Sequence, residues 1–571
     1  MGTGGGTGSS RDGGADAAEL SPDAEATTGC ARFGFVASGR ACAATGCSSF
    51  SCACPGAFPK SIASCSPDGC LIAAACARLC AEDLGNALSC TATYTVAPPG
   101  SGGNGGNGGS TGSGGDVAGT GGSGSGGGSG GSGVAPPSCS AADVRVPPTA
   151  AVLPASAPLS SARLLSDETG ALYLAGVVPG ASPVDLGGGA LPAGKRLVLW
   201  KLGANREHVW SRRFGTMYGP EDVATLSFAS NGDLLLGGIT GAQTDLGAGP
   251  EPLATVPQIY VVRYDRAGNL LARYLLPTSN AYPSLVSVVE APSSDLLLFG
   301  NFGTSFVAGG TTLTPAGPEQ NIFVVRFSAS GSVVEAKQYG RARNDLVFDA
   351  VGGPDGGVYL AGFAYYAVDF GKDAIDLGAS SSSYVVKLNA ALDPVWQNLI
   401  GGGGTYPRRA LLDRTTLVVA GDSTGTVSYG DLATGALGRG NVFVLSIEAA
   451  SGALATGKAY EQKGFGAALK SLARFPDGGV ALGGFLRPPA NFGGLDLAGP
   501  KIYEPFVARF DRDGQHLWST FFCSTSTSPP ATVTGIAGEG DSAVLLIPFS
   551  TDLELGSQLL QGTGTALVDL P

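Results

Sequence analysis

Ten cysteines between residues 30 and 90 form the densest set of reactive side chains in the sequence. An even number of cysteines in so short a segment is typical of a small module held by disulfides. Zinc is the alternative, but zinc sites favour Cys-x2-Cys pairs or mixed Cys and His ligands, and this segment has neither. The spacing leaves the pairing open. The cysteines expected to form disulfides are Cys30, Cys42, Cys47, Cys52, Cys54, Cys65, Cys70, Cys76, Cys80 and Cys90.

The remaining residues suited to catalysis or metal binding are few and repeat with the sequence. The two histidines, His208 and His516, each precede a tryptophan by two residues, which predicts matched outer-strand positions on the surface rather than a catalytic pocket. Asp185, Asp245 and Asp369 also recur at matched positions. Calcium needs about six to eight oxygen ligands at one point, and matched positions of separate repeats lie apart. We therefore expect these aspartates to cap turns, and we expect no catalytic residue, metal or cofactor.

These residues belong to a repeat that begins after Cys139. An apolar run that ends in glycine recurs at Gly176, Gly238, Gly300, Gly362, Gly421 and Gly484, and a seventh, degenerate copy has Pro548 there. Each run is followed by a triplet such as Asp-Leu-Gly. A strand rich in β-branched and aromatic residues comes next, for example YVVRY at 260–264 or FVVRF at 323–327, and then a turn and a last strand.

The repeat predicts a seven-bladed β-propeller with four antiparallel strands in each blade. Short β-rich runs between Gly, Asp and Pro turns read as hairpins, with no helical periodicity between them, and radially repeated four-stranded units are blades. The last copy stops after its third strand, so we expect Ala142–Val146 to supply the fourth and close the ring. Cys139 and Cys523 flank this closure. They would form a disulfide only if the linker brings their Cα atoms within about 7 Å.

The "aromatic-Val-Val-Lys/Arg-aromatic" strand and the Gly-ended strand resemble the bacterial SBBP-type β-propeller repeat family over roughly residues 160–571. The first and last copies depart from the pattern. The resemblance implies a propeller and an exported or surface-attached protein. It implies no catalytic motif.

Composition divides the chain into four predicted parts. Residues 1–29 read as a disordered tail, 30–96 as the disulfide module, 97–138 as a flexible Gly/Ser-rich linker and 139–571 as the propeller. The net charge of −12, without a basic stripe, excludes nucleic acid as an expected partner. No apolar run approaches the roughly 20 residues of a transmembrane helix. We expect a monomer.

The cysteine content predicts an extracellular or cell-envelope location, because disulfides persist in oxidising compartments. The first residues show no export signal, so we expect that signal to be removed or to lie upstream of Met1.

Aromatic residues mark the predicted ligand-binding face, which carries the connections between blades and the long loops between second and third strands. Aromatic side chains there could stack on sugars or peptide side chains, and packing between blades is the alternative role. The residues are Tyr218, Tyr282, Tyr365, Tyr366, Tyr406 and Phe465.

The sequence therefore favours a non-enzymatic binding or scaffold protein of the cell exterior, with an unknown protein or glycan as partner. One alternative is a propeller enzyme acting on polysaccharide, with Glu221, Asp222 and Asp345 as candidate carboxylates. Another is a purely structural surface lipoprotein.

Overall fold

The computed structural model of the 571-residue chain forms two compact units, Met1–Gly131 and Ser132–Pro571. The described residues are 36–38, 47–53, 60–62, 91–96, 149–152, 159–178, 183–215, 222–241, 244–247, 249, 257–278, 283–372, 374–401, 404–430, 436–439, 442–460, 467–497, 503–524, 531–556 and 558–570. The predicted tail and linker lie outside them, so these boundaries stay predictions.

The first unit contains one four-stranded sheet within the cysteine-rich segment. Its strand order is β1-β4-β2-β3, with β1 parallel to β4 and the other pairs antiparallel. The strands are β1 (Val36–Ser38), β2 (Cys47–Ala53), β3 (Lys60–Ile62) and β4 (Thr91–Val96). Cys47 and Cys52 lie on β2, whereas the other eight cysteines of the segment lie outside the described residues.

The second unit consists of antiparallel sheets, each built from consecutive strands. Sheet 1 contains β6 (Ser160–Ser166), β7 (Leu172–Val177), β10 (Leu197–Leu202) and β11 (His208–Phe214). Sheet 2 contains β12 (Thr225–Phe228), β13 (Leu234–Thr240), β14 (Gln258–Tyr264) and β15 (Leu270–Pro277). Sheet 3 contains β16 (Ser284–Glu290), β17 (Leu296–Phe302), β20 (Asn321–Phe327) and β21 (Val333–Tyr339).

The later copies form the same four-stranded unit. Sheet 4 contains β22 (Asp345–Gly352), β23 (Val358–Val368), β24 (Ile375–Leu388) and β25 (Pro394–Gly401). Sheet 5 contains β26 (Thr405–Asp413), β27 (Thr416–Ser423), β30 (Val442–Glu448) and β31 (Leu454–Tyr460). Sheet 6 contains β32 (Ala467–Arg474), β33 (Val480–Leu486), β34 (Glu504–Phe510) and β35 (His516–Phe521).

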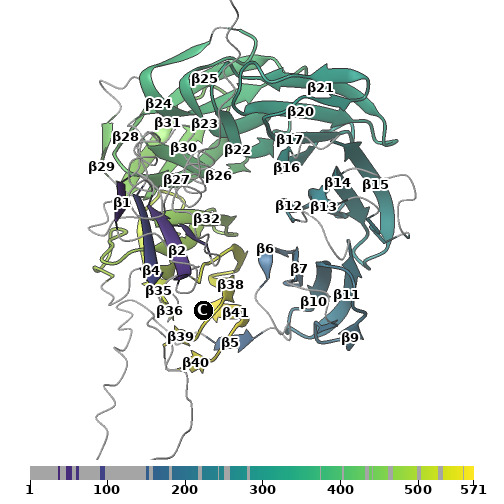
Figure 1. Cartoon of the computed structure of the whole chain (residues 1–571), viewed down its shortest axis with the longest axis vertical. Helices are drawn as coiled ribbons and strands as arrows, with labels where there is room; N and C mark the ends of the chain where they lie inside the picture. Colours follow the sequence, from purple (N-terminus) through teal and green to yellow (C-terminus); the bar gives the residue numbers. More distant parts are fainter. Residues whose placement is uncertain are drawn as a thin grey trace, which may run out of the picture. The chain divides into compact units, whose positions relative to one another are not determined.

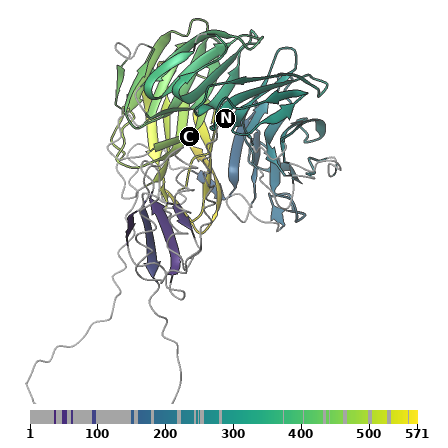
Figure 2. The ribbon, with the colours of Figure 1, turned by 45° about the horizontal axis from the view of Figure 1, so that its top comes forward.

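The last sheet joins the two ends of the second unit. Sheet 7 contains β37 (Gly535–Glu539), β38 (Ser542–Phe549), β41 (Gly564–Leu570) and β5 (Thr149–Val152), and β5 pairs antiparallel with β41 (Figure 2). The prediction that an N-terminal strand completes the last copy is correct, but the strand was placed wrongly at Ala142–Val146. Two of the four residues of TAAV are alanines, which strands disfavour, so the backbone pairing with β41 decides the position.

The first strand of each sheet lies innermost and contacts the first strands of the neighbouring sheets, from β6 through β37 and back to β6 (Figure 1). This ring of four-stranded antiparallel sheets is the architecture of a β-propeller. The cores are layers between adjacent sheets. The second and third strands are almost wholly buried, as in VYLAG of β23, because each is covered on both faces.

The Asp-Leu-Gly type of triplet links neighbouring sheets at one end of the ring. The Gly215 N–H, after β11, donates to the Asp245 carbonyl (2.7 Å), and the Gly340 N–H, after β21, donates to the Asp369 carbonyl (2.9 Å). Short strands in the same loops extend this pairing: β28 (Thr426–Tyr429) pairs with β25, and β39 (Leu553–Leu555) with β36 (Cys523–Ser524). The apolar middle residue of the triplet, such as Leu246 or Phe370, is buried.

The remaining short strands form hairpins in the loops between second and third strands. They are β8 (Val184–Asp185), β9 (Ala190–Leu191), β18 (Phe306–Ala308), β19 (Thr311–Leu313), β29 (Ala436–Arg439) and β40 (Gln558–Leu560).

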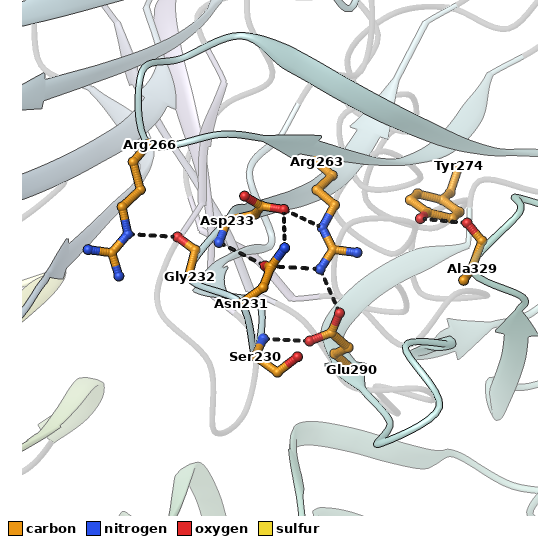
Figure 3. Close-up of polar contacts among 9 residues, drawn as sticks. All are labelled: Ser230, Asn231, Gly232, Asp233, Arg263, Arg266, Tyr274, Glu290 and Ala329. Atoms are coloured by element: carbon orange, nitrogen blue, oxygen red, sulfur yellow. Dashed lines mark hydrogen bonds and ion pairs between the residues drawn. The ribbon is translucent and has the colours of Figure 1, made fainter.

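Ion pairs link sheets at the other end of the ring, where the tight turns lie. Arg263 of β14 donates from Nε to Asp233 of its own sheet (3.0 Å) and from Nη2 to Glu290 of sheet 3 (2.7 Å; Figure 3). The Ser230 N–H also donates to Glu290 (2.5 Å). The Lys/Arg of the "aromatic-Val-Val-Lys/Arg-aromatic" strand thus holds a turn carboxylate, as Lys387 and Arg509 also do with Asp355 and Asp477.

The outermost strands share a local irregularity near their beginnings. In β11, β15, β21, β25, β31 and β35, the pairing with the third strand shifts by one residue, which is a β-bulge. The bulged residue is often an exposed aliphatic side chain. Such residues are Val209, Leu271, Val334, Val395 and Leu517.

The structure adds one finding about membranes. Within the described ranges, no helix reaches the length and apolarity that a membrane crossing requires.

Candidate functional site

Three of the predicted aromatic residues meet in one cluster between sheets 4 and 5. The Tyr406 ring stacks on Phe363 with centroids 5.1 Å apart and an interplanar angle of 26°, and it lies 6.2 Å from the Phe348 ring. Tyr365 packs edge-on against Phe363 (5.1 Å), and Tyr366 lies 6.5 Å from Tyr365. We call these five residues the aromatic cluster. It lies at the end of the ring where β25 connects to β26.

Tyr366 is the exposed member of this cluster, and its backbone conformation is unusual. Its φ is 66° and its exposed fraction is 47%. A non-glycine residue in the left-handed region costs on the order of 1 kcal/mol or more, and such residues concentrate at functional sites. The strand pairing shifts at Tyr366, because Tyr365 pairs with Ser381 and Ala367 pairs with Asp376 of β24. The sequence placed Tyr365 and Tyr366 in a loop, whereas both lie within the long strand β23.

Two arginines give the aromatic cluster positive charge. The guanidinium of Arg408 lies over Tyr406 (4.7 Å from the centroid) and Phe348 (5.1 Å), and it is held by Asp422 at 2.8 Å. Arg343 lies over Tyr366 at 5.8 Å. Burial raises the pKa of the Tyr406 and Tyr365 hydroxyls, so both stay neutral. The cluster thus combines apolar rings, neutral hydroxyls and cations, which suits stacking on a ligand with polar groups.

The other predicted aromatic residues, Tyr218, Tyr282 and Phe465, lie outside the described residues, as does Glu221. Their proposed role stays a prediction.

The two described candidate carboxylates do not form a catalytic pair. Asp222 accepts the Ile239 N–H (2.7 Å) and interacts with Arg163, whereas Asp345 accepts from the Arg341 N–H and from Asn321 (3.3 Å). Burial raises the pKa of Asp345 to about 7. Its Oδ1 is buried with no hydrogen-bond partner among the described residues. Its other oxygen accepts the Arg341 N–H and thereby holds the connection from sheet 3 to sheet 4.

The histidines lie under loops of their own sheets. A Cβ added to Gly188 would lie 2.1 Å from the His208 ring, and one added to Gly494 would lie 2.4 Å from the His516 ring. The imidazoles thus fill the space that these glycines leave. Both residues are half-buried, so the prediction of plain surface positions was incomplete.

The recurrent aspartates cap turns, as predicted. Oδ1 of Asp185 accepts the Gly187 and Gly189 N–H groups at 2.8 and 3.0 Å. Asp245 does the same with Gly247 and Gly249. The described ranges contain no group of three or more His, Cys, Asp or Glu side chains placed to hold a metal ion.

A polar ring inside the central channel was missed by the sequence interpretation. A cavity of about 190 Å³ is lined by the first strands of sheets 1 to 7. Each sheet contributes a polar residue twelve to fourteen positions before the recurring glycine (or Pro548) of its second strand, and sheet 6 also contributes Lys470. This narrow range of offsets is the signal that could have found them. We call these residues the polar ring: Arg163, Thr225, Ser287, Asp349, Arg409, Ser471 and Thr534.

Members of the polar ring hydrogen-bond to the next sheet. Arg163 Nε donates to the Ala224 carbonyl (3.0 Å), and Arg409 Nε donates to the Lys470 carbonyl (2.8 Å). Asp349 Oδ2 accepts the Ala410 N–H at 2.9 Å. The ring therefore holds neighbouring sheets together and fixes charged groups around the channel.

A larger hollow of about 570 Å³ lies at the tight-turn end, between sheets 5 and 6. Turn residues of both sheets line it, including Arg414, Pro476 and Arg512. We expected the tight-turn end to offer little apolar area for a ligand. Because this hollow provides space there, a binding experiment should test it as the alternative to the aromatic cluster.

Cys523 is buried at the end of sheet 6 and is disulfide-bonded, with a partner outside the described residues. The pairing with Cys139 stays a prediction.

Comparison with known proteins shows similarity in structure alone. No protein-family model and no curated protein matches the chain, so the SBBP resemblance has no independent support. Solved structures similar to this chain include the Dos1 propeller, at 11% identity over 74% of this chain and 95% of that one, with a TM-score of 0.33. BamB from Moraxella catarrhalis is similar at 10% identity over 72% and 100%, with a TM-score of 0.32. A virginiamycin B lyase from Staphylococcus aureus is similar at 10% identity over 74% and 99%, with a TM-score of 0.35. Similarity at this level does not extend to function.

Proposed function

We propose that this chain is a non-enzymatic binding scaffold of the cell exterior, whose seven sheets are the blades of one closed propeller. The proposed recognition surface is the aromatic cluster, and the proposed partner is a glycan or a protein. The observation that carries the proposal is Tyr366, an exposed aromatic residue in a strained conformation beside two further tyrosines. A rigid scaffold that presents aromatic anchors is a common design of binding surfaces.

The location in this proposal is supported by the ten cysteines between residues 30 and 90, since disulfide-rich modules belong to oxidising compartments. The absence of enzymatic activity is supported by the separate environments of Asp222 and Asp345, each of which is engaged by a different structural partner.

The first test screens the full chain on a glycan array and a peptide library, then measures affinity for the best probe with Tyr366→Ala and Tyr406→Ala. Truncation of an aromatic anchor typically costs about 2 kcal/mol of binding, roughly a 30-fold loss. We expect that loss for Tyr366→Ala, with an unchanged melting temperature or a higher one.

The matched control is Val334→Ala, which removes a similarly exposed apolar side chain from an outermost strand. Unchanged binding by Tyr366→Ala would contradict the proposal. Loss of binding on Arg512→Ala would instead place the ligand in the hollow at the tight-turn end.

A further inference from the structure

The central channel contains more positive charge than its own carboxylates compensate. Arg163, Arg409 and Lys470 all line it. None of the three forms an ion pair with a described carboxylate, whereas the neighbouring Arg408 is paired with Asp422 at 2.8 Å. This local excess of positive charge contrasts with the net charge of −12 of the whole chain.

The two arginines are oriented in the same way. Each donates from Nε to a carbonyl of the next sheet and from Nη1 to the carbonyl of the preceding residue, Ala162 at 3.1 Å and Arg408 at 2.9 Å. The main chain thus engages one donor of the Nε/Nη2 edge and one hydrogen of Nη1, so each of the two edges that can bind a planar carboxylate with two parallel bonds is partly used. Nη2 remains as the donor available to a ligand in the channel.

The acids nearest these cations, Asp349 in the channel lining and Asp222 close to Arg163, are hydrogen-bonded to main-chain N–H groups. Asp349 accepts a main-chain N–H at each oxygen, from Ala350 and Ala410, both at 2.9 Å. Asp222 accepts the Ile239 N–H at 2.7 Å. Burial raises the pKa of both carboxyls and so favours their neutral, protonated forms.

The cations also act on one another. Burial, followed by repulsion from Arg409, lowers the pKa of Arg163 to about 10. Burial, followed by repulsion from Arg408, lowers the pKa of Lys470, and Arg409 and Arg163 contribute further. The three cationic groups, from sheets 1, 5 and 6, are therefore close enough to repel one another. An anion bound between them would reduce this repulsion.

We propose that the central channel is a binding site for a tetrahedral oxyanion, either free phosphate or sulfate or the corresponding ester group of a larger ligand. Single donors converging from three sheets suit a tetrahedral anion better than a planar carboxylate, which prefers a bidentate edge, because the Nε/Nη2 edge of each arginine already has its Nε engaged. The space of about 190 Å³ admits one such group. This site is separate from the aromatic cluster and does not depend on it.

The test is calorimetric titration of the full chain with sodium phosphate, sodium sulfate and sodium malonate at pH 7.5 and constant ionic strength. We expect phosphate and sulfate to bind and malonate to bind more weakly. Lys470→Gln should weaken phosphate binding about tenfold, because a charged donor is lost while the wall is unaffected: only the main-chain carbonyl of Lys470 takes part in it. Asp222→Asn should strengthen phosphate binding a few-fold, because it removes a negative charge that interacts with Arg163. The fold should be unaffected, since Oδ1 of the amide can still accept the Ile239 N–H.

The matched control is Lys372→Gln, an exposed lysine in the loop after β23 with no part in the channel. Equal phosphate affinity in Lys470→Gln and wild type would overturn the proposal, as would the absence of phosphate and sulfate binding. Tighter binding of malonate than of phosphate would show that the ligand class is wrong. Comparing phosphate with glucose 6-phosphate distinguishes a free ion from an ester.

Discussion

Two contacts between neighbouring sheets use opposite arrangements of charge. Between sheets 2 and 3, the cation is on the third strand, and Arg263 reaches Glu290 of the following sheet. Between sheets 7 and 1, the matched third-strand position holds Asp569, and the cation is Arg206 of sheet 1, which reaches Asp569 at 2.7 Å and Glu539 at 2.9 Å. Both contacts thus pair opposite charges at the tight-turn end. They differ in whether the third strand supplies the cation or the carboxylate.

The contacts also differ in burial and in backbone support. The side chains of Arg263 and Glu290 are 13% and 6% exposed, whereas those of Arg206 and Asp569 are 21% and 38% exposed. Sheet 7, however, is completed by β5, a strand from the other end of the unit. Sheet 7 therefore depends on backbone pairing with a distant segment for its fourth strand, whereas the contact between sheets 2 and 3 contains the more buried ion pair.

The largest expected effect comes from deleting Thr149–Val152. The four residues pair with β41 from Ala566 to Asp569, so the deletion leaves that strand without its outer neighbour. At about 1 kcal/mol for each hydrogen bond, together with exposure of the sheet edge, we expect a loss of roughly 3 kcal/mol or more in unfolding free energy. Urea denaturation followed by circular dichroism measures it. A variant that replaces the four residues by Thr-Val-Thr-Val should recover stability. An unchanged urea midpoint after the deletion would show that β5 does not hold the ring closed.

The next effect is that of Arg263→Ala, which leaves Glu290 and Asp233 buried without their cation. Removing one partner of a buried pair costs about 3 kcal/mol. The more exposed Arg206→Ala should cost less, about 1 kcal/mol. The double variant Arg263→Glu with Glu290→Arg reproduces the polarity of the closing contact and should recover part of the loss. If it is no better than the two single changes added together, the polarity matters at this position.

The smallest effect is a pH dependence confined to the contact between sheets 2 and 3. Burial alone would raise the pKa of Glu290, but hydrogen bonds from Ser230 and Arg263 outweigh burial and hold that pKa below its usual value. A carboxyl with a depressed folded pKa stabilises the protein above its unfolded pKa of about 4.3, and this stability is lost as the pH falls through the lower folded value. The stability difference between wild type and Glu290→Gln should therefore shrink below about pH 4. Urea midpoints between pH 6 and pH 3 measure it, and a constant difference would contradict the assignment.

The repeat marks were sufficient to predict the third strands but not the closing strand. LVLWKL at 197–202 is β10 to the residue, because β-branched and aromatic residues at a buried position carry a strong local signal. The closing strand was predicted at ADVRV, residues 142–146, whereas the strand that pairs with β41 is TAAV at 149–152. The incomplete last copy predicted that a strand from the other end of the unit must pair there, but local sequence did not indicate which segment does so.

The aromatic cluster was partly predictable, and the polar ring was not. Tyr406 stood out because an aromatic residue recurs before the first strand of several copies, and Tyr365 and Tyr366 stood out because they fall in a predicted long loop. Arg163, Asp349 and Arg409 share only an offset of twelve or thirteen positions from a glycine, and their side chains differ in charge and size. Repeats are recognised by the residues that they share, and those residues mark common packing positions. A functional position at which each repeat has a different residue is therefore overlooked.

The bulges of the outermost strands affect how copies of this protein meet one another at high concentration. An outer strand that kept regular pairing would present a straight row of unpaired N–H and C=O groups, which can template the addition of a strand from another molecule. In six of the seven sheets, the bulge breaks that row and twists the strand away. The exposed aliphatic residues at these bulges lie on different sheets and are therefore separated around the ring, rather than joined into one apolar patch. The same irregularity, repeated from sheet to sheet, therefore makes the outer edges of this protein poor templates for strand addition.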